Sequence, residues 1–151
     1  MRDYRGKSTD THDWVFGHLI SGKYVIDERQ IVAIVTHDTE IFPHCEVSYD
    51  EIDPVTIGQC SGIYTMDEIE GGDTRCTFIY EGDIVEPVLT IGTHPGFSWG
   101  RHVVVFDRGA FCLKDRRGQI TPMCNFSTAV EFKVIGNIHD NPDMVEGTSD
   151  A

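Results

Sequence analysis

The chain has 151 residues, with 25 acidic against 12 basic residues and a formal net charge of −13 at pH 7. This length suits one domain or two small ones and allows a hydrophobic core without disulfides or metal ions. Because 40% of the residues are hydrophobic, the composition excludes a disordered chain. No apolar run approaches the roughly 20 residues of a membrane-spanning helix, and the first residues do not lead into a secretory segment. We therefore expect a soluble, cytoplasmic protein.

The N-terminal half contains short apolar runs that predict β-strands. Residues 14–20 and 23–26 flank Ser21-Gly22, a pair typical of a two-residue hairpin turn. The β-branched run 31–35 predicts a buried strand. Further short strands are predicted at residues 41–42 and 55–57.

The strand signals of the C-terminal half are clearer. Residues 102–106 and 110–113 are apolar runs on either side of Asp107-Arg108-Gly109, which predicts a hairpin with a three-residue loop and Gly109 at positive φ. Apolar and charged residues alternate over 130–134, which indicates a half-buried antiparallel strand. Further strands are predicted at 76–80, 84–85 and 88–91, with a turn at 115–118.

Helix signals are few and short. Thr65-Met66-Asp67-Glu68 fits a capping box, which Gly71-Gly72 would end within two turns. Asn141 followed by Pro142 favours one terminal helical turn over residues 143–146.

The prediction is an all-β, mainly antiparallel fold with minor short helices. Its parts are an N-terminal β sub-domain (1–65), an acidic connecting loop (66–75), an SH3-like β sub-domain (76–140) and a terminal turn and tail (141–151).

Charge is distributed unevenly along the chain. Residues 37–87, the acidic block, hold thirteen acidic residues and one basic residue, Arg75. Residues 101–118, the basic block, hold five basic residues and two acidic ones. The acidic block is interpreted as a solvated face, as a surface that contacts the basic block of another copy, or as a mimic of nucleic acid. An acidic field repels phosphate, so we expect no nucleic-acid binding. The one candidate patch for it combines Arg101, Arg108, Arg116 and Arg117 with Phe97 and Trp99.

Residues that carry chemistry form no convincing catalytic pattern. The five cysteines are odd in number and include no C-x-x-C pair, which indicates reduced, mostly buried thiols and no structural zinc. Gly58-Gln59-Cys60-Ser61-Gly62 spells a cysteine version of the nucleophile elbow. An elbow needs a helix after it, whereas Ile63-Tyr64 and an acidic segment follow here. The seven histidines are scattered, and the glycine-rich phosphate motifs are absent. We therefore expect no enzyme and no catalytic, cofactor-binding or metal-binding residues.

Four blocks of the sequence resemble, in order, the blocks of one known family. The opening block joins Arg5-Gly6-Lys7 to Trp14-Val15-Phe16-Gly17, and the others lie at residues 55–62, 79–85 and 132–142. Together they resemble the YopX-like proteins of phages and prophages. Two departures are Cys60, where the family usually has an aromatic residue, and residues 63–75, which replace a tighter turn. The resemblance implies a phage-encoded accessory protein that self-associates, and it supplies no catalytic residues.

The residues of these blocks are interpreted as structural. Gly82 lies between two acidic residues, where glycine accommodates positive φ, and Asp83 is placed to bond backbone amides of the turn. Gly136-Asn137 predicts a second turn. SH3-like barrels start strands in the way that residues 80–85 do. The structural motif residues are Gly6, Trp14, Gly17, Gly58, Gln59, Gly62, Tyr80, Glu81, Gly82, Asp83, Gly136, Asn137 and Pro142.

The function expected from this sequence is that of a phage or prophage accessory or interaction protein without enzymatic activity. It would act as a homo-oligomer in the cytoplasm of the bacterial host. Its expected partners are further copies of itself and an unidentified host protein, and neither nucleic acid nor membrane. The alternative is an acidic inhibitor, or nucleic-acid mimic, of a host factor.

Overall fold

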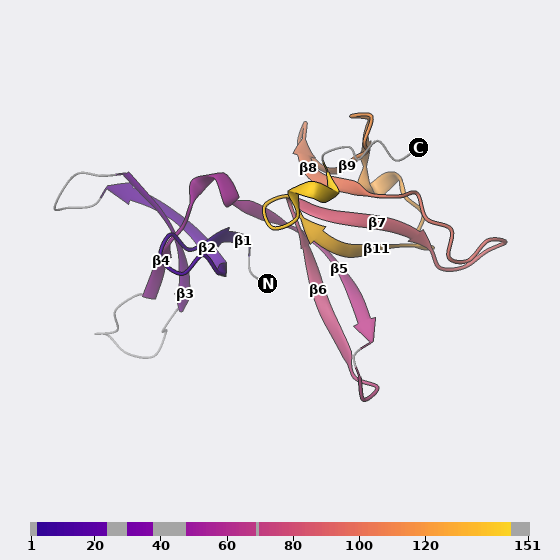
Figure 1. The fold of residues 1–151 in the computed structure, drawn as a ribbon, viewed down its shortest axis with the longest axis horizontal. Helices are drawn as coiled ribbons and strands as arrows, with labels where there is room; N and C mark the ends of the chain where they lie inside the picture. The colour runs from indigo at the N-terminus through magenta and orange to yellow at the C-terminus, as the bar shows by residue number, and fades with distance from the viewer. Residues whose placement is uncertain (1–2, 24–29, 38–47, 69, 146–151) are drawn as a thin grey trace. The chain divides into compact units, whose positions relative to one another are not determined.

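The computed structural model describes residues 3–23, 30–37, 48–68 and 70–145 (Figure 1). The chain divides into two compact units, residues 1–60 and 61–151. Both sheets are antiparallel, and the helical segments of the described residues are short 3-10 turns. No helix in this part of the chain is both long and apolar enough to cross a membrane. The predicted all-β, antiparallel fold is confirmed.

The strands of the first unit belong to a six-stranded antiparallel sheet with the order β4-β3-β2-β1-β5-β6, whose last strand is part of the second unit. The β2–β3 ladder runs from the pair His18–Val35 to the pair Lys23–Gln30. Its fully buried apolar residues include Ala33 and Ile34, from the β-branched run that predicted a strand. The strands are β1 (Tyr4–Lys7), β2 (Trp14–Lys23), β3 (Gln30–His37), β4 (Ser48–Glu51) and β5 (Gly58–Glu68), which continues into the second unit.

Two local predictions in this unit are wrong. Ser21-Gly22 is not a turn, because β2 continues through it and pairs Ser21 with Val32. A Ser-Gly pair permits a turn without requiring one, and here the ladder with β3 runs through the pair, from His18 to Lys23. Residues 55–57 are not a strand: Pro54–Thr56 form the 3-10 helix η1, in which Asp53 Oδ1 accepts a hydrogen bond of 3.1 Å from the Val55 amide. The strand predicted at 41–42 lies outside the described residues.

The second unit contains a five-stranded sheet with the order β10-β9-β8-β7-β11. The core of the unit joins Val85, Val104 and Leu113 of this sheet to Ile79 of β6 and Met123 of η2. Neither sheet closes on itself within the described residues, so the predicted SH3-like barrel is not confirmed. The strands are β6 (Thr74–Tyr80), β7 (Asp83–Leu89), β8 (His102–Asp107), β9 (Ala110–Lys114), β10 (Ile120–Pro122) and β11 (Val130–Asn137), with the 3-10 helices η2 (Met123–Asn125) and η3 (Pro142–Met144).

The predicted position of the β8–β9 hairpin is confirmed, whereas its predicted loop length is wrong. Asp107 pairs with Ala110, so the loop has two residues and not three. Arg108 and Gly109 have φ of 48° and 82°, and two successive positive φ values are typical of the type I′ hairpin turn.

The helix predicted at Thr65 is a strand. β5 runs to Glu68, and Thr65 is buried, with its Oγ1 donating a hydrogen bond of 2.9 Å to Glu131 Oε1. A long-range contact to β11 therefore replaces the local capping bond. As a result, the predicted connecting loop at 66–75 contains the end of β5 and the start of β6, whereas the unit boundary falls between residues 60 and 61.

Candidate functional site

The predicted motif residues of the first unit surround β1. Tyr4 pairs with both Gly17 and Gln59, and Arg5 pairs with Gly58. An added Cβ at Gly17 would overlap the carbonyl oxygen of Val35, so only glycine fits between these strands. Gly6 lies in β1, and the Arg5 Cζ atom lies 4.6 Å from the Trp14 ring centroid, a cation–π distance. These residues hold the sheet of the first unit together.

The motif residues of the second unit meet at Gly82. The φ of Gly82 is +88°, which confirms the predicted positive φ. Its N–H donates to the Val104 carbonyl and its carbonyl accepts from the Ile138 amide, both at 2.9 Å. Tyr80 N–H donates to Asp83 Oδ2, also at 2.9 Å. The turn thus connects β7 both to β8 and to the segment that follows β11, while Glu81 is half-buried beside it.

The segment that follows β11 is fixed by two asparagines. The turn predicted at Gly136-Asn137 is wrong, because both residues lie in β11 beside a register shift and the turn is formed by residues 138–140. Asn137 Oδ1 accepts from the amides of His139 and Asp140 at 3.0 and 2.9 Å. Asn141 is the N-cap residue of η3, as predicted, but its side chain makes no capping bond: Asn141 Oδ1 accepts from the Asn137 amide at 3.2 Å instead. Pro142 opens that helix. The remaining motif residue of this unit, Gly62, lies in β5 and has a φ of +78°.

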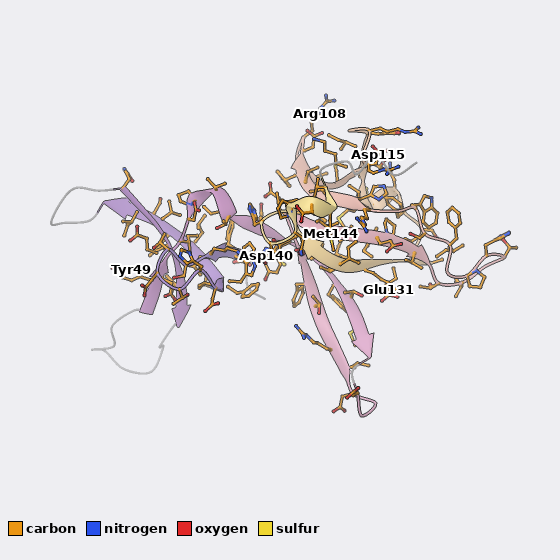
Figure 2. All side chains as sticks on the ribbon, viewed as in Figure 1. Tyr49, Arg108, Asp115, Glu131, Asp140 and Met144 are labelled. Atoms are coloured by element: carbon orange, nitrogen blue, oxygen red, sulfur yellow. The ribbon has the colours of Figure 1, made fainter. Side chains whose placement is uncertain are left out.

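A groove of about 700 Å³ lies against this anchored segment and the strands β8 and β9. We call it the basic groove (Figure 2, where Asp115 and Met144 are labelled). Its apolar lining comes from Ile84, Val103, Val105, Ile138, Met144 and Val145, with Pro142 and Gly118 beside them. Its polar lining comes from Arg101, His102, Lys114, Asp115, Arg116 and Arg117. The groove therefore offers an apolar surface with four cationic side chains.

The predicted turn at 115–118 places two of these cations. Asp115 Oδ1 accepts from the Arg117 amide at 2.8 Å and from the Gln119 amide at 2.9 Å. The Gly118 amide donates to the Asp115 carbonyl at 3.0 Å. The Asp115 carboxylate thus bonds the backbone of its own turn, and the side chains of Arg116 and Arg117 remain exposed.

The cations of the groove have no carboxylate partner among the described residues. Ion pairs recorded there join His18 to Asp3 at 3.1 Å and Arg108 to Asp107 at 3.9 Å. Neither pair includes Arg101, Lys114, Arg116 or Arg117. The described acidic residues of the same unit therefore form no recorded ion pair with the groove cations.

Comparison with known proteins identifies the family. A family model described as YopX protein matches residues 3–146. The chain belongs to the YopX family. A solved structure to which it is similar is the X-ray structure of protein yopX from Bacillus subtilis, with 16% identity, a TM-score of 0.49, and coverage of 99% of this chain and 100% of that one. A search of curated proteins gave no match.

The groove of this YopX-family chain differs from the basic-aromatic patch that was predicted. Arg101, Arg116 and Arg117 line it, whereas Arg108 does not. Phe97 packs edge-to-face on Trp99 at 5.0 Å, away from the groove lining. Sequence reasoning missed the apolar lining residues that follow β11. Their signal is weak: Ile138, Met144 and Val145 are isolated apolar residues in a polar tail.

The other candidates for chemistry in this YopX-family chain remain apart. Cys60 is buried in β5, which continues to Glu68, so no helix follows it as an elbow requires. His102 Nδ1 donates to the Gly100 carbonyl at 2.9 Å. Within the described residues, no three His, Cys, Asp or Glu side chains gather where they would hold a metal ion. Cys112 is a second buried thiol, while Cys76 and Cys124 are exposed.

Proposed function

We propose that this protein is a phage- or prophage-encoded accessory protein without enzymatic activity, which acts as a homo-oligomer in the cytoplasm of its bacterial host. The basic groove is the surface through which each copy binds another. Membership of the YopX family supports this proposal, because the resemblance noted in the sequence implies self-association.

The observation that carries the proposal is the contrast between the groove and the rest of the chain. Four cationic side chains surround an apolar surface, in a protein of net charge −13. An acidic surface of another copy provides their missing partners. In such a contact the buried apolar residues contribute most of the binding free energy, and the charges fix the orientation and raise the association rate.

Light scattering coupled to size exclusion tests this proposal. At micromolar protein concentration and moderate salt we expect the mass of several chains. The mass should fall as salt rises, since exposed charge pairs are screened beyond about 8 Å at physiological ionic strength. A single-chain mass under all these conditions would overturn the proposal and would favour the acidic inhibitor of a host factor instead.

A further inference from the structure

A second apolar surface of the C-terminal unit is exposed among the described residues. We call residues 62–68 of β5 and residues 70–78, which lead into β6, the arm; its far end projects away from the five-stranded sheet (Figure 1). Ile63 packs against the core of the unit. Tyr64 and Met66 lie on the opposite face of β5 from Ile63, because successive strand residues point to opposite faces. Tyr64 is 56% exposed and Met66 is 50% exposed. The Tyr64 ring contacts Phe78 edge-on at 5.9 Å, so one face of the arm is an exposed apolar stripe.

The tip of the arm is acidic. Glu70 and Asp73 are exposed there, Asp67 and Glu68 precede them in the sequence, and Arg75 is the one basic residue of the arm. The arm therefore combines an apolar stripe with a negative tip. The basic groove has the complementary composition, an apolar lining with four cations and Asp115.

We propose that the arm of one copy docks in the basic groove of a second copy. This inference rests on the proposed self-association and assigns its two contact surfaces. The groove accepts Tyr64, Met66 and Phe78, and its cations pair with the carboxylates of the tip. Arm and groove are different surfaces, so the contact is heterologous, and each copy uses its arm on one neighbour and its groove on the other. Such contacts build a closed ring or an open filament.

Mixing two variants tests this arrangement directly. The arm variant carries Tyr64→Ser and Met66→Ser, and the groove variant carries Arg116→Glu and Arg117→Glu. For each variant alone, the dissociation constant of the assembly should be more than about tenfold higher than for the wild type. An equimolar mixture should form a dimer and stop there, because only the arm of the groove variant and the groove of the arm variant are intact. A matched control, Ile91→Ser, alters a side chain that is 66% exposed outside both surfaces and should assemble normally.

Thiol reactivity in the unmodified protein provides a readout that no folding defect can mimic. Cys76 is exposed and shares the outer face of the arm with Phe78, two residues later in β6. The rate of Cys76 alkylation should be much lower in the assembled protein. It should rise again when dilution dissociates the assembly. Cys124, exposed outside the arm, should react at the same rate in both states.

The outcomes separate this inference from the proposed function. A wild-type protein that is always monomeric overturns both. If the wild type assembles while the arm variant assembles equally well and Cys76 stays reactive, arm docking is wrong and self-association stands. A mixture in which both variants remain monomeric overturns the heterologous arrangement.

Discussion

The backbone N–H of Tyr80 donates a hydrogen bond of 2.9 Å to Oδ2 of Asp83, whose side chain is only 2% exposed. The carboxylate thereby closes the turn between β6 and β7 from inside the protein. Gly82, between them, bonds to Val104 in β8 and to Ile138 beside the basic groove. A short local motif therefore fixes one wall of the candidate interaction surface.

Removing the Asp83 carboxylate should destabilise the C-terminal unit. Asp83→Ala leaves the Tyr80 N–H buried without this acceptor, which costs about 1–3 kcal/mol. Asp83→Asn keeps an acceptor oxygen and should cost less. The exposed Asp143 provides the control, since Asp143→Ala should change stability by less than about 0.5 kcal/mol. Urea denaturation measures all three, and equal midpoints for the two alanine variants would contradict this account.

Glycine at position 82 is required by its backbone conformation. Gly82→Ala places a Cβ on a residue with φ of +88°, and we expect a loss of about 1 kcal/mol or more in unfolding free energy. Thr128→Ala, at an exposed position of the same unit, should have little effect. Denaturant titration again provides the measurement, and a Gly82→Ala protein as stable as the wild type would show that the turn tolerates a side chain.

The five thiols should all be free. An odd cysteine count with no C-x-x-C pair predicts no intramolecular disulfide, so alkylation of denatured, unreduced protein should modify five thiols by mass. In the folded protein, exposed Cys124 should react quickly and buried Cys60 and Cys112 only on unfolding. Four or fewer modified thiols in freshly prepared protein would refute the first statement, and rapid labelling of folded Cys60 would refute the second.

Reversing the groove charges should weaken assembly without unfolding the chain. Arg116 and Arg117 are exposed, and exposed ion pairs contribute about 0.2–1 kcal/mol each. Changing both to Glu also adds repulsion, so we expect a dissociation constant about tenfold higher or more at low salt.

Arg108→Glu is the matched control for this reversal, because Arg108 is 94% exposed and lies outside the groove lining. Light scattering should show normal assembly for this control at every salt concentration. If both reversals weaken assembly equally, net charge and not the groove governs association.

Local sequence patterns correctly predicted those features of the structure that depend on residues close together in the sequence. Alternation and β-branched runs located most strands of the C-terminal unit, and the acid-glycine-acid pattern predicted the conformation of Gly82. Patterns that permit two structures were misinterpreted. Thr65 has the sequence of a capping box after it, yet its hydroxyl donates a hydrogen bond to Glu131, which lies 66 residues away. No local pattern contains that partner.

The sequence by itself determined the β-class of this protein, its family and its uneven charge. Only the tertiary structure decided that Arg101, Arg116 and Arg117 share a groove with Ile138 and Met144. The sheet order places β7 between β8 and β11, and Gly82 bonds Ile138 across that junction. Side chains more than 20 positions apart therefore meet because antiparallel pairing and backbone hydrogen bonds, rather than sequence spacing, set their distance.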